Sequence, residues 1–265
     1  MIINCKEIAQ KWKNECVGIN AHLAIVQVGD NPASNSYIKG KLKDCDEVEF
    51  KSSHYKLDAE VTEEELTELI LKLNNDKDVN GIIVQLPLPK HIDAIKIVNL
   101  VAVEKDVDGF LYESEFTPCT PMGVVNLLDE INVDVNGKFV VVLGRSEFVG
   151  KKAADLLLAK NATVAICHSK TPTDVRDSLL KSADIVISAV GSAKLFEAIH
   201  VKDGAIVIDV GINRNELGKL CGDFAPDENR DILYTSVPGG VGLLTRAMLL
   251  KNTYAAYMNQ NKNIM

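Results

Sequence analysis

The sequence lacks the features that would carry this chain into or across a membrane. No apolar run approaches the roughly 20 residues that a membrane-spanning helix requires. The N-terminal segment MIINCKEIAQKWKNEC also lacks the apolar core of a signal peptide. We therefore expect a cytoplasmic protein with no membrane partner.

Paired cysteine motifs and an excess of positive charge are also absent. The six cysteines, at positions 5, 16, 45, 119, 167 and 221, form no CxxC pair. This argues against a zinc site or a disulfide framework, so we expect free thiols and no metal. The net charge of -8 argues against a surface that binds nucleic acid. A soluble enzyme acting on a small molecule is the better interpretation.

The sequence does contain a strand-to-helix transition across a turn bounded by glycines. Residues 139–143 form an apolar run typical of a strand buried on both faces, and helical spacing follows from Val149. The turn between them contains Gly144, Arg145, Ser146 and Gly150. Such a turn lets backbone N–H groups approach a pyrophosphate at a helix N-terminus. Because the spacing departs from GxGxxG, an ordinary tight turn is the alternative.

No acidic residue stands where a NAD-binding domain usually has one. The strand predicted over residues 161–167 is followed by His168, Ser169 and Lys170, whereas a carboxylate at this point binds the ribose hydroxyls of NAD. Its absence favours NADP, because a carboxylate would repel the 2′-phosphate. Arg145 could supply the matching cation, since its planar guanidinium suits phosphate oxygens. A solvated arginine is the alternative.

A tyrosine and a lysine are spaced for proton-transfer chemistry in the N-terminal half. Residues 33–48 are predicted to be helical, which puts Tyr37 and Lys41 on one face, four residues apart. A tyrosine hydroxyl can hold a lysine amine in position for proton transfer. A surface contact is the alternative, since Lys39 and Lys43 are nearby.

Further polar residues follow the next predicted strand. Gln85 ends the apolar strand predicted over residues 81–85, and Leu86 begins the LPLP segment after it. Open α/β sheets bind ligands outside such strand ends. Asp108 lies in the glycine-containing turn KDVDGF and could bind the N–H groups of a ring. Loop solvation for Gln85 and turn stabilisation for Asp108 are the alternatives.

The remaining patterns predict two α/β domains within the 265 residues. In the first half of the chain we expect a helix capped by Asn4, a strand over 22–28, a helix with a capping box at Thr62 and Glu65, and a helix over 93–101. In the second half we expect a helix from Pro121 and strands over 184–188 and 205–209. The last expected element is a C-terminal helix capped near Thr245.

These segments together resemble the methylenetetrahydrofolate dehydrogenase/cyclohydrolase family over nearly the whole chain. The resemblance rests on motifs in matching order: VGDNPASNSYIKGKLKDC, GIIVQLPLPKHI, KDVDGF, PCTPMGV, VVLGRSEFVGKKAADLLL, NATVAICHSKT, ADIVISAVG, GAIVIDVGINR and VPGGVG. It implies an α/β catalytic domain over residues 1–118, completed by a C-terminal helix over 243–265. It also implies a Rossmann-type NADP-binding domain with a mostly parallel sheet over residues 119–242.

The resemblance also assigns roles to individual residues. Lys41 resembles the family's catalytic lysine and general acid/base, with Tyr37 as its partner and Gln85 as the residue that orients it. Asp108 resembles the carboxylate that binds the folate ring. The positions that match folate contacts are Tyr37, Lys41, Gln85, Leu86, Asp108, Pro238, Gly239 and Gly240. The positions that match NADP contacts are Gly144, Arg145, Ser146, Gly150, Ser169 and Ile212.

The implied reaction is NADP-dependent oxidation of 5,10-methylenetetrahydrofolate to 5,10-methenyltetrahydrofolate, followed by hydrolysis to 10-formyltetrahydrofolate. Such an enzyme is both an oxidoreductase and a hydrolase, needs no metal, and serves one-carbon metabolism and purine biosynthesis. The resemblance also implies a homodimer.

Departures from the family pattern bear on this expectation. Only LYESEFT separates KDVDGF from PCTP, where the family has a longer segment, and a glycine that usually ends the catalytic helix is replaced by Glu49. Ser236, Leu243 and Leu244 replace Pro, Pro and Met beside the predicted folate-binding turn. The alternatives are an enzyme with only one of the two activities and a non-catalytic NADP- or folate-binding protein. On architecture alone, a shikimate-type NADP dehydrogenase is a further alternative.

Overall fold

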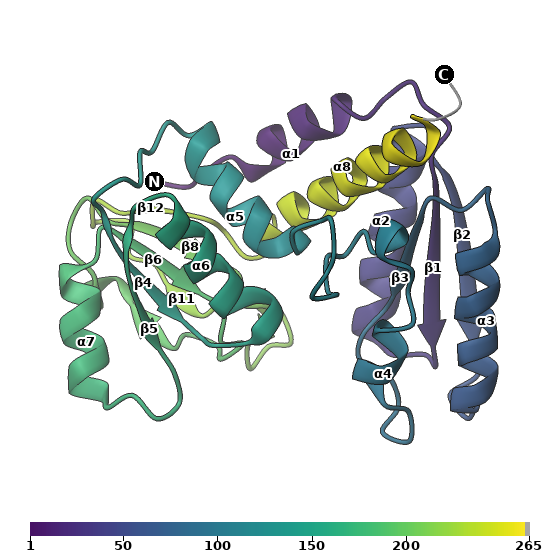
Figure 1. Ribbon diagram of the computed structural model, residues 1–265. Coiled ribbons are helices and arrows are strands. Elements are labelled where there is room, and N and C mark those ends of the chain that lie inside the picture. Colours follow the sequence, from purple (N-terminus) through teal and green to yellow (C-terminus); the bar gives the residue numbers. More distant parts are fainter. Residues whose placement is uncertain (263–265) are drawn as a thin grey trace. The chain divides into compact units, whose positions relative to one another are not determined.

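The computed structural model describes residues 1–262, which form two compact units (Figure 1). Unit 1 contains Met1–Gln10 and Thr120–Thr245, and unit 2 contains Lys11–Cys119 and the residues from Arg246 on. Three helices have residues in both units: α1 (Cys5–Asn14), α5 (Cys119–Glu130) and α8 (Val241–Asn261). The last three residues of the C-terminal helix predicted over 243–265 lie outside the described residues.

Unit 2 is built around a three-stranded parallel sheet in the order β2-β1-β3. Its strands are β1 (His22–Val28), β2 (Lys51–Leu57) and β3 (Gly81–Val84). Its remaining helical elements are α2 (Pro32–Glu47), α3 (Glu63–Asn75), α4 (Ala94–Val98) and the 3-10 turn η1 (Val103–Lys105). Every residue of β1 is buried, as its central position in the sheet requires.

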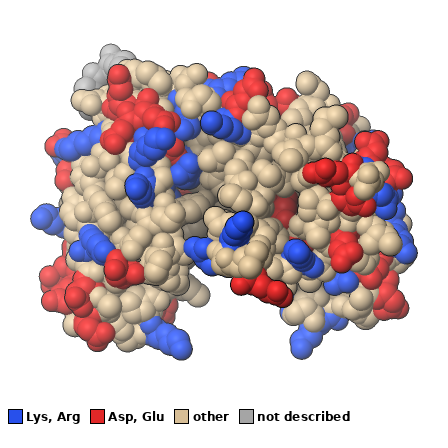
Figure 2. Space-filling model, turned by 180° about the vertical axis from the view of Figure 1, so that it is seen from behind, with Lys and Arg blue, Asp and Glu red and all other residues tan. Residues whose placement is uncertain are grey.

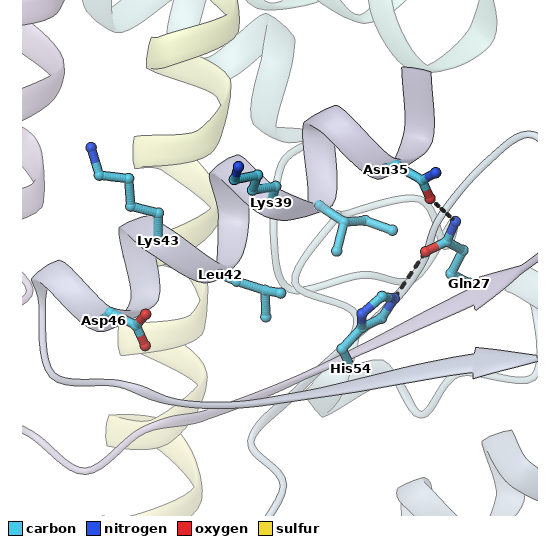
Figure 3. Close-up of a pocket in the computed structure, with 8 residues that line it drawn as sticks. Gln27, Asn35, Lys39, Leu42, Lys43, Asp46 and His54 are labelled. Atoms are coloured by element: carbon cyan, nitrogen blue, oxygen red, sulfur yellow. Dashed lines mark hydrogen bonds between the residues drawn. The ribbon is translucent and has the colours of Figure 1, made fainter. Parts of the chain in front are cut away.

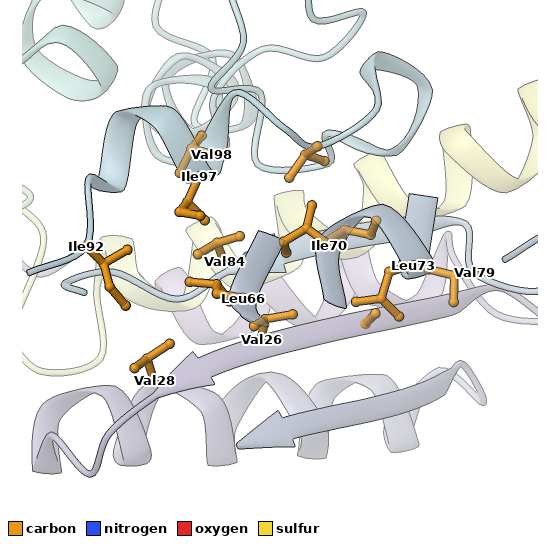
Figure 4. Close-up of a cluster of buried hydrophobic side chains, with 13 residues drawn as sticks. Val26, Val28, Leu66, Ile70, Leu73, Val79, Val84, Ile92, Ile97 and Val98 are labelled. Carbon is orange, nitrogen blue, oxygen red and sulfur yellow. The ribbon is translucent and has the colours of Figure 1, made fainter. Parts of the chain in front are cut away.

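Helix α3 packs one apolar stripe against this sheet (Figure 4). The predicted capping box fixes its first turn, because the Thr62 hydroxyl accepts from the Glu65 N–H at 3.2 Å and the Glu65 carboxylate accepts from the Thr62 N–H at 2.9 Å. The buried stripe residues pack with alternate residues of β1 and β3 and with α4; they are Leu66, Ile70 and Leu73. This core holds the end of β3, where the predicted Gln85 follows.

Unit 1 contains a five-stranded parallel sheet in the order β12-β8-β6-β4-β5. Its strands are β4 (Phe139–Leu143), β5 (Thr163–Cys167), β6 (Ile185–Ser188), β8 (Ile206–Asp209) and β12 (Leu233–Tyr234). Short pairs are formed by β7 (Phe196–Glu197) with β11 (Phe224–Ala225), and by β9 (Asn213–Arg214) with β10 (Leu220–Cys221). The helical elements are the π-turn η2 (Glu147–Lys151), α6 (Lys152–Ala159), α7 (Thr173–Ser182) and the 3-10 turn η3 (Ala198–His200).

The predicted α/β class is confirmed, and several element boundaries are corrected. The helix predicted over 93–101 is limited to α4, because Asp93 caps it and 3-10-type bonds to residues 97 and 98 turn the chain afterwards. Helix α8 begins at Val241 rather than near Thr245, whose hydroxyl instead lies 3.1 Å from that of Thr120. The strand predicted from 161 begins at Thr163, because Asn161 adopts a positive φ of 65°.

The surface carries both signs of charge (Figure 2), and the cysteines are unpaired. On the face drawn in Figure 2, Lys and Arg side chains are interspersed with Asp and Glu side chains. All six cysteines are free, and five of them are buried. Across residues 1–262, no helix combines the length and the apolar character needed to cross a membrane.

Candidate active site

The lysine predicted to carry the chemistry is buried on helix α2. Asn31 caps this helix by accepting from the N–H groups of Ala33 and Ser34, and Pro32 occupies the first turn. Lys41 is only 6% exposed, and its Nζ atom lies 5.4 Å from the centroid of the Tyr37 ring. This contact is a cation–π interaction between residues one helical turn apart. The predicted pair is therefore a buried contact rather than a surface one.

Gln85 holds the amine of Lys41 from the neighbouring strand end. Lys41 Nζ donates to Gln85 Oε1 at 3.2 Å, and Gln85 Nε2 donates to the carbonyl oxygen of Leu86 at 2.8 Å. The second bond fixes which way the amide faces, because only its nitrogen can donate to a carbonyl. The oxygen of Gln85 is therefore directed at the lysine. The peptide bond between Leu86 and Pro87 is cis.

Asp108 belongs to the same unit and is electrostatically linked to Lys41. Burial raises the pKa of the Asp108 carboxyl above its ordinary value, while the positive charge of Lys41 opposes this shift and the charge of Asp106 adds to it. The residue itself is half-buried, so part of it is accessible. A half-buried carboxyl beside an amine suits a ligand that offers ring N–H groups.

In unit 1, the predicted nucleotide turn brings two glycines into close backbone contact. A Cβ atom on Gly150 would overlap the carbonyl oxygen of Gly144, and a Cβ on Gly144 would lie 2.5 Å from the carbonyl oxygen of Ala189. Gly144 also has a φ of 110°. The Ser146 hydroxyl accepts from the Gly150 N–H at 3.3 Å and caps the π-turn. Both positions therefore exclude a side chain, in a turn that lies at the N-terminal end of the helical segment after β4.

Arg145 and Ser169 follow two paired positions of the sheet. Leu143 of β4 is aligned with Cys167 of β5, so Arg145 and Ser169 each lie two residues beyond the same level of neighbouring parallel strands. Both residues are exposed. The segment after β5 contains His168, Ser169 and Lys170, with no carboxylate. A cation and a hydroxyl at this edge of the sheet fit the 2′-phosphate of NADP.

The loops after β6 and β8 are braced by a buried aspartate that the sequence did not indicate. Asp223 is fully buried and accepts from the Ser188 hydroxyl at 2.8 Å and from Asn213 Nδ2 at 2.9 Å. It also accepts from three backbone N–H groups, those of Val190, Gly191 and Ser192. These bonds hold the turn after β6 together with the segment that carries the predicted cofactor residue Ile212. Ile212 itself is 57% exposed.

A second buried aspartate lies beside the first. Asp209, at the end of β8, accepts from the N–H groups of Gly211 at 2.9 Å and Phe224 at 2.8 Å. Burial raises the pKa of its carboxyl to about 6, and the nearby charge of Asp223 adds to the shift. The two aspartates therefore stabilise the loop ends of the sheet at the cost of holding negative charge in a buried place.

The predicted folate-binding turn 238–240 directly precedes α8 and is counted with unit 1. The peptide bond before Pro238 is cis, and a Cβ on Gly240 would overlap the carbonyl oxygen of Ser236. The other predicted folate contacts lie in unit 2, where the structure brings together Tyr37, Lys41, Gln85, Leu86 and Asp108.

A pocket of about 380 Å³ lies elsewhere on unit 2 (Figure 3). It is lined by one face of α2, from Asn35 to Asp46, together with Gln27 and His54. At 100° per residue this face is opposite to the one with Tyr37 and Lys41. Its polar wall is a chain in which Gln27 accepts from His54 Nε2 at 2.9 Å and donates to Asn35 at 2.7 Å. The pocket contains none of the predicted site residues.

Comparison with known proteins identifies the family to which both domains of the chain belong. The catalytic-domain model described as tetrahydrofolate dehydrogenase/cyclohydrolase matches residues 3–108, and the NAD(P)-binding-domain model of the same family matches residues 118–261. The chain belongs to this family. Bifunctional protein FolD of Ruminiclostridium cellulolyticum is 49% identical over 98% of both chains.

Solved structures agree with this assignment. The bifunctional methylenetetrahydrofolate dehydrogenase/cyclohydrolase FolD of Campylobacter jejuni has a TM-score of 0.92 and 42% identity, covering 98% of this chain and 99% of that one. The Trypanosoma brucei enzyme, solved with NADP cofactor and an inhibitor, has a TM-score of 0.90 and 31% identity, covering 98% of this chain and 97% of that one.

Membership of the tetrahydrofolate dehydrogenase/cyclohydrolase family confirms the predicted fold class, with a catalytic and an NAD(P)-binding domain. It makes the chain a bifunctional dehydrogenase and cyclohydrolase of one-carbon folate metabolism. The match over both domains decides against the shikimate-type alternative. Among the described residues, no group of three or more His, Cys, Asp or Glu side chains is placed to hold a metal ion.

Proposed function

We propose that this chain oxidises 5,10-methylenetetrahydrofolate with NADP and hydrolyses the methenyl product to 10-formyltetrahydrofolate, with Lys41 as the general acid/base. The observation that carries this proposal is the hydrogen bond of 3.2 Å from Nζ of the buried Lys41 to Gln85 Oε1, in the same unit as Asp108. A buried amine with one fixed acceptor is oriented for proton transfer.

Lys41 acts in the hydrolytic step. Water that adds to the methenyl carbon must lose a proton, and the lysine amine accepts it. The same group returns the proton to the ring nitrogen as the carbon–nitrogen bond breaks. The remaining hydroxyl proton is released to solvent as the formyl C=O bond forms, so one proton is released in each turnover. Gln85 keeps the amine directed at the reacting carbon, and the contact with the Tyr37 ring further restricts its position. General acid–base catalysis of this kind contributes about 100-fold to 10,000-fold in rate.

Asp108 binds the folate ring, and Leu86 with the turn Pro238, Gly239 and Gly240 completes the substrate contacts. The carboxyl of Asp108 accepts from ring N–H groups, which orients the one-carbon bridge toward Lys41. Burial raises the pKa of this carboxyl, and N–H donors from a bound ring would favour its ionised form.

The cofactor is held by Gly144, Arg145, Ser146, Gly150, Ser169 and Ile212. When bound, NADP accepts the hydride from the one-carbon bridge. The closely packed turn with Gly144 and Gly150 lies at the N-terminal end of the helical segment after β4, where a pyrophosphate binds in folds of this kind, which supports the fit. Arg145 and Ser169 bind the 2′-phosphate, and the absence of an acid in the segment 168–170 favours NADP over NAD.

We propose a cytoplasmic homodimer whose product supplies purine biosynthesis. The catalytic domain comprises residues 1–118 with the C-terminal helix over 243–265, and the NADP-binding domain comprises residues 119–242. The inclusion of residues from Arg246 on in the compact unit of Lys41 supports the assignment of the C-terminal helix to the catalytic domain, whereas Met1–Gln10 belong to the other compact unit. Sedimentation of the purified protein tests the dimer.

The test of the proposed reaction is a spectroscopic assay of the purified protein. Methylenetetrahydrofolate is supplied with NADP or NAD, and the decay of added methenyltetrahydrofolate is followed separately. Both reactions, with NADP preferred, are the expected result. One reaction alone would point to the altered turn at Ser236 or the short loop after Leu111, and neither reaction would favour a binding protein.

A further inference from the structure

A buried aspartate on α2 is held by cations from two other helices. Asp44 is 3% exposed and lies three residues after Lys41. Its Oδ1 atom accepts from Lys13 Nζ at 2.9 Å, and its Oδ2 atom lies 3.0 Å from Arg246 Nε of α8. Within residues 1–262, Oδ2 has no aligned hydrogen bond. Its partner in the described part of the chain is the guanidinium of Arg246.

Arg246 also packs directly on the backbone of α2 beside the proposed catalytic lysine. A Cβ atom on Gly40 would overlap Arg246 Nη1 and lie 2.8 Å from its Cζ atom. Only a residue without a side chain lets the guanidinium cross the helix here. Arg246 thus contacts α2 at Gly40 and at Asp44, which flank Lys41 in the sequence. Two contacts one turn apart fix both the rotation and the axial position of a helix.

A second residue of α8 holds the turn that contains Asp108. Asn252 is 9% exposed, and its Nδ2 atom donates to the carbonyl oxygen of Val107 at 2.9 Å and to that of Thr117 at 3.3 Å. Val107 directly precedes Asp108, and its carbonyl also accepts from Cys119 Sγ at 3.3 Å. Asn252 therefore joins the two ends of the short loop that follows Asp108.

We propose that α8 positions both halves of the folate site, with Arg246 acting on Lys41 through Gly40 and Asp44, and Asn252 acting on Asp108 through Val107. This inference rests on the proposed roles of Lys41 and Asp108. Arg246 and Asn252 are positioning residues, because neither is required to touch the substrate. Because Arg246 acts on Lys41 and Asn252 acts on Asp108, we expect substitution of one to change mainly kcat and substitution of the other to change mainly KM. Arg246 sets the geometry of proton transfer, and Asn252 sets the affinity for the folate ring.

The experiment compares Arg246→Met and Asn252→Ala with Lys251→Ala in the full chain. Lys251 lies between them on α8 and makes an exposed ion pair with Glu15 at 2.7 Å. A displacement of about 1 Å costs up to about 100-fold in rate. We therefore expect Arg246→Met to lower kcat for methenyl hydrolysis by about tenfold or more, with KM within about twofold.

For Asn252→Ala we expect the opposite pattern. The KM for methenyltetrahydrofolate should rise by about tenfold, while kcat stays within about twofold of the wild-type value. Lys251→Ala should leave both parameters unchanged. Circular dichroism establishes the temperature at which each variant is fully folded, and kinetics are measured there. A general loss of structure would lower kcat, folate affinity and NADP affinity together, and that pattern would overturn the inference.

Asp44 supplies a second test of the same route. Arg246→Met leaves a buried carboxylate with only Lys13, whereas Asp44→Asn/Arg246→Met also removes that carboxylate and so avoids its destabilising effect on the fold. If Arg246 acts through Asp44, then Asp44→Asn alone lowers kcat, and the double variant is no slower than Arg246→Met. Additive losses would contradict this route.

Lys41→Met distinguishes failure of this inference from failure of the proposed site. If Lys41→Met abolishes hydrolysis while Arg246→Met and Asn252→Ala keep wild-type kinetics, the site stands and the role of α8 is wrong. If Lys41→Met retains full activity, the site itself is wrong, and the positioning roles are wrong with it.

Discussion

The Nζ atom of Lys41 and the Oε1 atom of Gln85 lie 3.2 Å apart, and a bond from Gln85 Nε2 to the carbonyl of Leu86 fixes the amide in this orientation. The acceptor for the lysine is therefore an uncharged oxygen at a strand end. This partner orients the amine by a hydrogen bond rather than by an ion pair.

Replacing Gln85 by leucine should remove the group that orients Lys41 while leaving Lys41 buried. The variant keeps an apolar side chain of similar size but removes the acceptor, so Lys41 loses its fixed direction. We expect kcat for methenyl hydrolysis to fall by about tenfold to 100-fold. NADP binding, followed by fluorescence titration, should be unchanged. Retention of the wild-type rate would show that the bond to Gln85 has no part in catalysis.

Arg145 should determine the preference for NADP. Arg145→Gln removes the cation proposed to bind the 2′-phosphate, and charged hydrogen bonds are worth about 1.5–3 kcal/mol. We expect kcat/KM with NADP to fall by about tenfold to 100-fold, while the value with NAD changes little. Ser169→Asp should also lower kcat/KM with NADP, because the new carboxylate would repel the 2′-phosphate. Equal losses with both cofactors would contradict a role in recognising the phosphate.

Glu49 makes the end of α2 a place where a single substitution should stabilise the protein. Its φ is 64°, in the left-handed region that glycine adopts without strain. Glu49→Gly should raise the free energy of unfolding by about 0.5–1 kcal/mol, measured by urea denaturation. Glu49→Ala is the matched control, because alanine keeps the Cβ atom and should give no comparable gain. Equal effects of the two substitutions would show that charge, not backbone conformation, is responsible.

Asp209 should make unfolding depend on pH in a defined direction. Burial raises the pKa of its carboxyl from 3.8 to about 6, so the folded chain binds this proton more tightly than the unfolded chain. The resulting stabilisation is complete below about pH 4 and is lost as the pH rises through 6. The stability of the wild type relative to Asp209→Asn should therefore decrease by about 2–3 kcal/mol between about pH 4 and pH 7.

Asp184 provides the control of opposite sign. A hydrogen bond from Lys202 lowers the pKa of this carboxyl, so its contribution is present above the unfolded pKa and is lost as the pH falls. Urea unfolding is measured for the wild type, Asp209→Asn and Asp184→Asn between about pH 4 and pH 7. The midpoints compare the wild type with each variant at each pH. A wild-type advantage over Asp209→Asn that stays constant with pH would contradict the raised pKa.

Local patterns were sufficient to predict the elements whose own residues determine them. The all-apolar strand β4 and the capping box of α3 appeared in the structure as expected. Strand β2 was missed because it is a partly exposed edge strand with the polar sequence KSSHYKL. Helix α7 was missed because only Leu180 of its residues is fully buried, so its apolar pattern is weak.

The candidate site was predictable where a motif contained its residues, as for Tyr37 and Lys41. The bracing residues were not, because their partners are distant in the sequence. Arg246 contacts Gly40 and Asp44 from about 200 positions away, and a lone arginine in a C-terminal helix carries no local signal. Asp223 likewise binds backbone N–H groups of residues 190–192, which no side-chain pattern records.

The most direct test of the central claim is the rate of methenyltetrahydrofolate hydrolysis by Lys41→Met, measured beside its NADP affinity. Methionine is similar in length to lysine and carries no amine. We expect a loss of about 100-fold or more in hydrolysis, with NADP bound as tightly as by the wild type. Hydrolysis at the wild-type rate would contradict the account and remove Lys41 from the mechanism.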